Sequence, residues 1–177
     1  MKKKSLIIVC ALALILTVAI GGTVAWLTAE TEKVTNTFTY GDINITLAES
    51  ENLDLKMVPG NDITKDPKVT VNANSEDCYL FVKVEKSDNF DNFMTYEMAE
   101  GWNELTGEAG VYYREVDNKA ADQVFDVLKG NKVTVGEDVS KEKLTALTDT
   151  PKPTLAFTAY AVQKANIADA AAAWAKI

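Results

Sequence analysis

Apolar and polar residues alternate along most of the chain, at the two-residue period of a half-buried β-strand. The even positions from Cys78 to Val84 are all apolar and form one face of the clearest candidate. A second long candidate covers 154–163, with apolar residues at the odd positions from Leu155 to Ala161. Shorter candidate strands cover 43–47, 53–57, 69–73, 93–97, 111–116, 124–128 and 132–135. Many short strands separated by turn signals predict a mostly β protein with an antiparallel β-sandwich fold.

Turn and helix signals divide these strands. Pro59, Gly60, Asn61 and Asp62 form a strong turn sequence between two strand patterns. Gly130-Asn131 separates two short strand patterns and suggests a hairpin. Short helices are expected over 141–147, with Ser140 as N-cap, and over 166–176 at the C-terminus, with Asn166 as N-cap.

The first 25 residues have the organisation of a secretory signal helix. Lys2, Lys3 and Lys4 precede an apolar run over 6–20, and no charged residue follows until Glu30. Small side chains at Thr23 and Ala25 predict cleavage before Trp26. The alternative is that this segment stays uncleaved as a membrane anchor, which is the only membrane contact expected. Both readings place the rest of the chain outside the cytoplasm.

Removing residues 1–25 changes the charge and cysteine counts. The full chain of 177 residues has a formal net charge of −8 and two cysteines. The exported part has 15 basic and 26 acidic residues, a net charge of −11, and only Cys78. This acidity argues against nucleic-acid binding. Cys78 lies on an apolar strand face and is expected to be a buried free thiol, although a reactive thiol or an intermolecular disulfide stays open.

Candidate catalytic and metal-binding chemistry is sparse. The chain has no histidine, which excludes Ser-His and Cys-His pairs and the HExxH helix of metalloproteases. The acidic residues are scattered, so no catalytic residue is predicted and no cofactor is expected. Asp88 and Asp91, in the Asx-rich segment 88–92, are the candidate calcium ligands, because calcium prefers oxygen donors. The alternative is an Asx-rich turn without metal.

Several segments resemble the TasA- and camelysin-like family of secreted proteins processed by the SipW-type signal peptidase. The segment 21–28, followed by 36–43, resembles the signal and mature N-terminus of this family. The segment 57–67, with its Pro-Gly turn, and the C-terminal segments 159–163 and 171–175 resemble it as well. The middle of the chain, about 87–150, carries no diagnostic motif.

This resemblance implies a jelly-roll-like sandwich over 41–177 that ends in a C-terminal helix. It also implies SipW-type processing and assembly into extracellular fibres of biofilm matrix or spore coat. The segment 26–40, freed by cleavage, would be donated as a strand to the next subunit. The donor residues carried over from the family are Trp26, Leu27, Val34, Phe38 and Tyr40.

The sequence therefore predicts a secreted structural protein of a Gram-positive cell surface that associates with itself or with other matrix proteins. Two alternatives from other functional classes stay open. The first is a camelysin-like metalloprotease, since some relatives carry that description, although the missing histidines argue against it. The second is a monomeric surface module that binds a carbohydrate or a protein, either with or without calcium.

Overall fold

The computed structural model describes residues 42–50, 55–147 and 151–177. The predicted signal segment and the predicted donor segment lie outside these residues. The described strands are β1 (Ile45–Ala48), β2 (Asp62–Thr64), β3 (Lys68–Val71), β4 (Cys78–Lys86), β5 (Met94–Thr95), β6 (Asn103–Glu104), β7 (Val111–Val116), β8 (Gln123–Asp126), β9 (Lys132–Val135) and β10 (Leu155–Gln163). The described helices are α2 (Lys141–Ala146) and α3 (Ala170–Trp174), with short 3-10 turns at η1 (Phe90–Asn92) and η2 (Lys129–Asn131).

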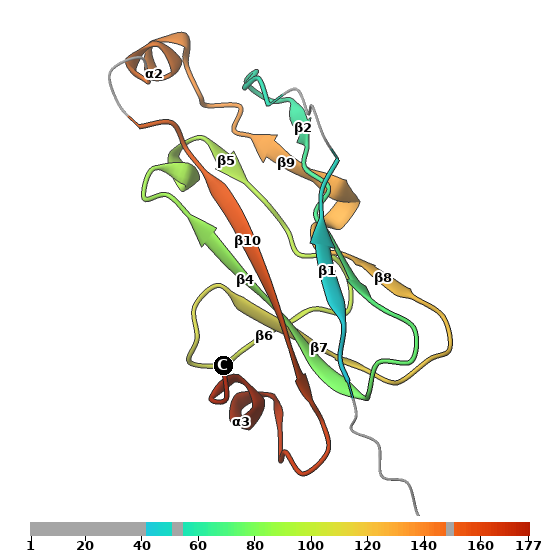
Figure 1. Cartoon of the computed structure of the whole chain (residues 1–177). Coiled ribbons are helices and arrows are strands. Elements are labelled where there is room, and N and C mark those ends of the chain that lie inside the picture. The colour runs from blue at the N-terminus through green and yellow to red at the C-terminus, as the bar shows by residue number, and fades with distance from the viewer. Residues whose placement is uncertain (1–41, 51–54, 148–150) are drawn as a thin grey trace, which may run out of the picture. The chain divides into compact units, whose positions relative to one another are not determined.

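The strands form three antiparallel sheets (Figure 1). The largest has the order β10-β4-β7-β6, and the two three-stranded sheets have the orders β1-β3-β8 and β2-β9-β5. Every strand pairing among the described residues is antiparallel. The prediction of a mostly β, antiparallel fold with short helices, one of them at the C-terminus, is therefore confirmed.

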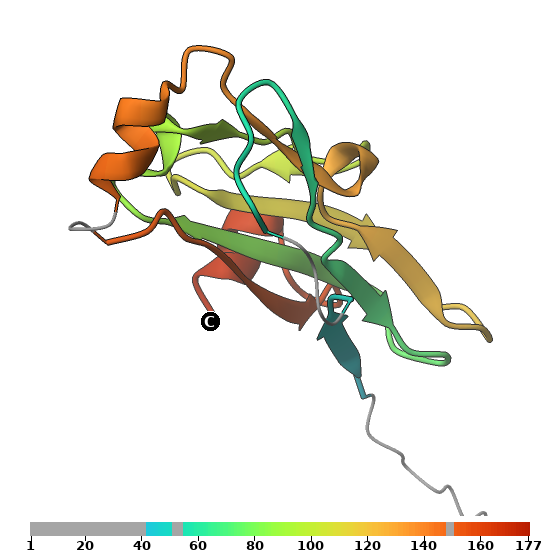
Figure 2. The same cartoon turned by 90° about the horizontal axis from the view of Figure 1, so that it is seen from above.

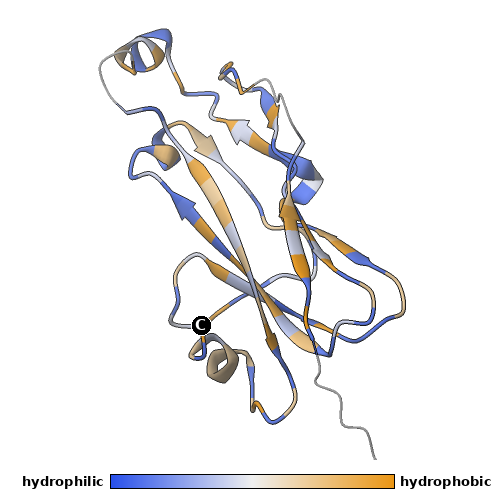
Figure 3. Ribbon diagram, viewed as in Figure 1, coloured by the Kyte–Doolittle hydropathy of each residue, from blue (hydrophilic) through white to orange (hydrophobic). Residues whose placement is uncertain are grey.

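Strand β4 is central because both of its faces are buried. The even-numbered face, with Cys78, Leu80 and Val82 fully buried, packs in the main core against residues of the two smaller sheets. The odd-numbered face, with Tyr79 and Phe81, forms a second core with α3. The contacts of the two cores thus place α3 and the smaller sheets on opposite faces of β4. Figure 2 shows the fold from above, with α3 behind β4 in this view. The alternating hydropathy along β4 and β10 is visible in Figure 3.

Among the described residues, the side chains of both cores come from the range 43–174. The chain also separates into two units at Thr39 and Tyr40, and the second unit holds all the described residues. Since burial of apolar surface is the main stabilising contribution to folding, we expect the chain from residue 41 onward to fold on its own. Within the described residues, no helix combines the length and the apolar character needed to cross a membrane.

Several local predictions are confirmed. The predicted strand 154–163 corresponds to β10, whose odd positions face the main core while Tyr160 and Val162 face the second. The helix over 141–147 corresponds to α2, and the Ser140 side chain caps it by accepting from the Lys143 amide. The Pro59–Asp62 turn is present, with the Asn61 amide donating to the Val58 carbonyl at 3.0 Å.

Three local predictions are wrong. The Gly130-Asn131 hairpin does not form, because β8 and β9 belong to different sheets and η2 is a crossover between them. The C-terminal helix begins after Asp169, whose side chain caps it, because Asn166 has a positive φ of 62° that ends the preceding turn. The described part of the predicted strand 53–57 is irregular, and Leu55 there is 59% exposed.

Candidate functional site

The Pro59–Asp62 turn joins the irregular segment 55–58 to the sheet of β9. Gly60 adopts a φ of 75°, which favours glycine. Its amide donates to the Val135 carbonyl at 3.2 Å, and the Val135 amide donates to the Asn61 carbonyl at 2.9 Å. The turn is thus held on β9 from both sides, and it fixes the start of β2 and the position of the segment before it.

Asp62 adds a side-chain contact to this attachment. Its carboxylate accepts hydrogen bonds from the Lys132 Nζ and the Thr134 hydroxyl of β9, each at 2.7 Å. The hydrogen bond from Lys132, and next that from Thr134, holds the pKa of Asp62 below its usual value. Asp62 is therefore an anchor of the β2–β9 pair, in a position where the sequence had indicated only a turn.

An apolar groove opens between this turn region and the start of β10. It has a volume of about 400 Å³, which lies within the range of small binding pockets. Its apolar walls come from segment 55–58, the strands β2, β5, β9 and β10, and η1. The lining residues are Leu55, Met57, Ile63, Phe90, Met94, Val133, Pro153 and Leu155, with Lys65, Lys152 and Thr154.

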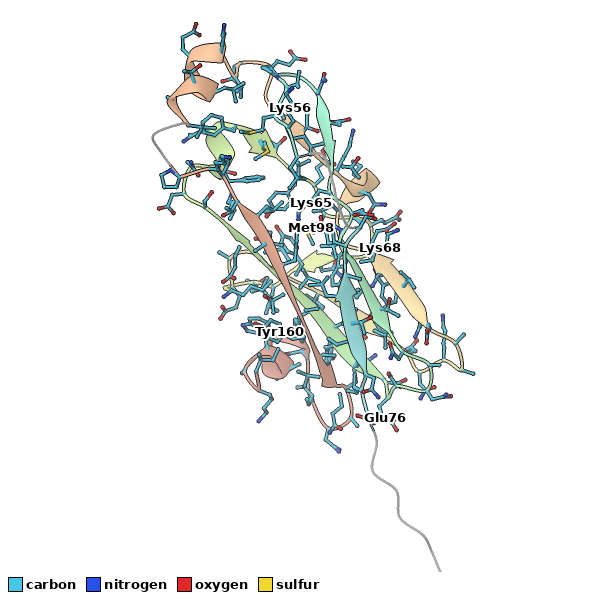
Figure 4. All side chains as sticks on the ribbon, turned by 45° about the horizontal axis from the view of Figure 1, so that its top comes forward. Lys56, Lys65, Lys68, Glu76, Met98 and Tyr160 are labelled. Carbon is cyan, nitrogen blue, oxygen red and sulfur yellow. The ribbon has the colours of Figure 1, made fainter. Side chains whose placement is uncertain are left out.

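Lys65, the first residue of the β2–β3 connection, marks the polar side of the groove (Figure 4). Its Nζ is 2.7 Å from the Glu49 carboxylate and 5.6 Å from the centre of the Phe157 ring. The neighbouring Asp66 accepts hydrogen bonds from the amide and the hydroxyl of Ser50. These contacts attach the segment that follows β1 to the β2–β3 connection.

Strand β10 runs beside the groove and is an edge strand. It pairs with β4 along all nine of its residues, from Leu155 opposite Lys86 to Gln163 opposite Cys78. β1 lies next to its other edge but forms its ladder with β3 instead. Among the described residues, the second edge of β10 therefore forms no strand ladder. An unpaired strand edge is a template for another strand.

The described chain begins at the opposite end of β10 from the groove. The Asp42 carbonyl accepts a hydrogen bond from the Glu76 amide, and the Lys164 amide donates to the Asp77 carbonyl. Glu76 marks this end of the domain in Figure 4. Nine residues of strand at about 3.3 Å each separate it from the groove by roughly 30 Å.

Asp88 and Asp91, the candidate calcium ligands, lie in the loop around η1. Asp91 is ion-paired with Lys86. Ser87 and Asn89 organise the loop, because Asn89 donates to the Pro151 carbonyl at 2.8 Å and Ser87 accepts from the Thr154 amide at 2.9 Å. The loop thus has a structural role beside the start of β10.

Cys78 is fully buried at the start of β4. Burial, and next the charge of Asp77, raises the pKa of its thiol to about 11. The thiol therefore packs as a small apolar group in this fold. The cleavage residues Thr23 and Ala25 and the donor residues of 26–40 lie outside the described residues.

The sequence prediction missed the groove itself. Its apolar walls come from six different segments, and Met57 and Phe90 carried no signal beyond apolar character. The one usable sequence signal was the segment 55–58, which places the large apolar residues Leu55 and Val58 next to a turn. In the structure these two residues are 59% and 41% exposed.

A protein-family model, described as camelysin metallo-endopeptidase, matches residues 1–93. The match covers more than half of the chain, including the Pro59–Asp62 turn and the whole of β4. The chain belongs to the camelysin metallo-endopeptidase family. The family resemblance seen in the sequence is thereby confirmed. Searches of curated proteins and of solved structures give no match.

The camelysin family name implies a metal, and the donor residues of this chain do not fit a catalytic zinc centre. Such a centre takes three protein ligands, most often histidines, and keeps one position open. The chain has no histidine. Within the described residues, no three His, Cys, Asp or Glu side chains come together, and the Cys78 thiol is buried.

Proposed function

We propose that this chain is a secreted structural protein of a Gram-positive cell surface that assembles into fibres. In this proposal, the SipW-type signal peptidase frees the N-terminus at Trp26. Residues 26–40 of one copy then add as a strand to the next copy. The observation that carries the proposal is the edge of β10 that forms no ladder with any described strand, beside an apolar groove.

The chemistry of the groove suits an extended, partly apolar segment. The β10 edge offers backbone groups for a ladder, and the groove takes alternate side chains, which is how β-augmentation obtains affinity and specificity. The segment 26–40 supplies Trp26, Leu27, Val34, Phe38 and Tyr40. The proposal therefore uses main-chain hydrogen bonding for affinity and apolar pockets for register.

The position of the groove supports a head-to-tail contact. The described chain begins about 30 Å from the groove, at the other end of β10. A segment donated from that end to the groove of the next copy repeats the same contact in every subunit. Such a heterologous contact propagates as a filament when it does not close into a ring.

The test compares the chain from residue 26 with the chain from residue 41 by light scattering and electron microscopy. We expect filaments from the first and monomers from the second. A synthetic peptide of residues 26–40 should bind the shorter chain. Monomers of both chains under all conditions, with no peptide binding, would overturn the proposal.

A matched pair of variants tests the groove. Leu55 and Val124 are 59% and 58% exposed, and Leu55 lines the groove whereas Val124 lies on β8. Leu55→Asp should block filaments because it places a charge at the apolar wall. Val124→Asp makes the same chemical change elsewhere and should leave assembly intact. Equal effects of the two variants would count against the groove.

The family name favours one rival function, a metallo-endopeptidase. We propose that the chain is not a protease, because its donor residues do not fit a zinc centre. A casein assay with and without chelator, on protein freed of host proteases, separates the two functions. Chelator-sensitive hydrolysis that disappears when particular carboxylates are replaced would reverse this assignment.

A further inference from the structure

A second cavity opens between β5 and β7. It has a volume of about 290 Å³, and Lys86, Asp91, Thr95, Tyr96, Met98 and Tyr112 line it. Burial, and next the neighbouring Tyr112, raises the pKa of Tyr96 to about 12. The walls therefore combine aromatic rings with hydroxyl, carboxylate and ammonium groups.

Arg114 is not among the residues that line this cavity but lies on the same strand as the lining residue Tyr112, and it is the only arginine in the chain. It follows Tyr112 by two positions on β7, so the two side chains share the inward face about 7 Å apart. Its guanidinium carbon is 4.0 Å from the centre of the Phe125 ring and 5.3 Å from that of Trp102. Cation–π contacts of this kind hold the planar group in a defined orientation.

The surroundings of Arg114 restrict it further. The Trp102 Nε1 donates to the Asp126 carbonyl at 2.9 Å, which ties the indole to β8. Gly101 has a φ of 88°, and a Cβ added there would lie 2.7 Å from the Arg114 Nη2. The absence of a side chain at Gly101 thus leaves room for the end of the guanidinium.

This oriented cation has no acidic partner. Among the described residues, no carboxylate lies within 4.0 Å of Arg114, and its buried Nε makes no hydrogen bond. Partial burial alone lowers the pKa of its guanidinium. A guanidinium whose fork is free of protein acceptors matches the geometry of an incoming carboxylate.

We propose that the flank between β5 and β7 binds an acidic polysaccharide, with Arg114 holding the carboxylate of a uronic acid unit. Thr95, Tyr112 and the Lys86–Asp91 pair supply donors and acceptors for the sugar hydroxyls. A peptide strand is disfavoured here, because the neighbouring edge strand β6 has only two residues.

The net negative charge of the protein does not oppose this binding strongly. At 0.15 M ionic strength, interactions between exposed charges fade beyond about 8 Å. The electrostatic energy of the bound sugar carboxylate therefore depends mainly on the charges nearest to it. They include Arg114, the Lys86–Asp91 pair, whose charges offset each other, and Glu104, whose charge acts on Tyr96.

The first test measures binding to the chain from residue 41, which lacks the proposed donor segment, so that fibre formation does not interfere. The probes are oligogalacturonate, a neutral oligogalactan of equal length, and polyglutamate. We expect oligogalacturonate to bind at least about tenfold more tightly than either other probe, since a charged hydrogen bond is worth that much. Equal binding of polyglutamate would make the ligand an acidic polypeptide and overturn the proposal, as would no binding of oligogalacturonate.

Variants then assign the binding to Arg114. Arg114→Gln should weaken oligogalacturonate binding at least about tenfold, and Arg114→Lys should weaken it less, because lysine keeps the charge and loses the fork. Lys119→Gln makes the same charge change on an exposed loop and should have no effect. Unchanged affinity in a folded Arg114→Gln variant would refute the role of Arg114.

A measurement on the unaltered protein covers the case in which these variants fail to fold. Because the chain has one arginine, its NMR spectrum should contain a single arginine Nε–Hε resonance. We expect this resonance to move during titration with oligogalacturonate and to stay fixed with the neutral oligogalactan. A resonance that stays fixed while oligogalacturonate binds would place the ligand elsewhere.

Discussion

Replacing Trp174 by alanine tests how the C-terminal helix is held on the sheet. The Trp174 ring centre lies 5.3 Å from that of Phe81 and 5.5 Å from that of Tyr160, the latter edge to face. Tyr160 lies beside α3 (Figure 4). Since α3 has only five residues, it is not stable alone, and these ring contacts together with buried Ala170 and Ala173 fix its position.

The expected cost follows from this packing. Truncating a fully buried aromatic residue costs about 3–5 kcal/mol, and aromatic pairs contribute about 0.5–1.5 kcal/mol each beyond their burial. Trp174 is half-buried, so we expect Trp174→Ala to lower the free energy of unfolding by about 2–3 kcal/mol. For a domain of this size, that corresponds to a fall in Tm of roughly 10 °C.

The assay is urea unfolding followed by circular dichroism, because the substitution removes a fluorophore. The midpoint should fall at an unchanged slope, which reports a change in stability alone. Ile177→Ala is the control, since Ile177 is 53% exposed and its loss should cost less than about 0.5 kcal/mol. A loss below 1 kcal/mol for Trp174→Ala would refute the docking of α3 through this ring.

Three further predictions follow from single residues. Cys78 should resist a thiol reagent in the native protein at pH 8 and react fully in urea, because burial raises its pKa to about 11; rapid native labelling would contradict this. Gly110→Ala should destabilise the fold by about 2 kcal/mol or more in urea unfolding, since φ is 75° and a Cβ would lie 2.7 Å from the Val84 carbonyl oxygen. Gly107→Ala, where φ is also positive but no atom lies within 4 Å, should cost clearly less. Asp62 has a lowered pKa in the folded state, so its stabilisation is complete above the unfolded pKa and disappears as the pH falls through the folded one. Asp62→Asn should therefore flatten the acid limb of the stability curve below about pH 4, and an unchanged limb would contradict this reasoning.

The long strands could be predicted from the sequence because each carries its own burial pattern. Successive side chains of β4 and of β10 point in turn into the two cores. The two-residue period is therefore sufficient to predict both strands. Short strands such as β2 and β6 have two or three residues and too little sequence for a period. The Gly130-Asn131 hairpin failed because a local turn signal does not determine which sheet the next strand joins.

The groove and the Arg114 flank were less accessible to sequence reasoning, because both depend on segments far apart in the chain. Phe90 and Leu155 meet in the groove although 65 positions separate them. Trp102, Arg114 and Phe125 come from three different segments. The sequence pattern along one strand indicates which of its faces is buried. Which strand edge of a sheet stays unpaired depends instead on how all the other strands pair.

The half of the chain that matches the family model contains residues that are central to the proposed structural function. Residues 1–93 include the N-terminal segment, the Pro59–Asp62 turn and β4. The turn holds the segment that carries Leu55 and Met57, and within the described part of the chain β4 is the only strand that forms a ladder with β10. These matched residues therefore contribute to the groove wall and pair with one edge of β10, and they include no histidine. In the function that we propose, family membership carries a surface that accepts a strand rather than a reaction.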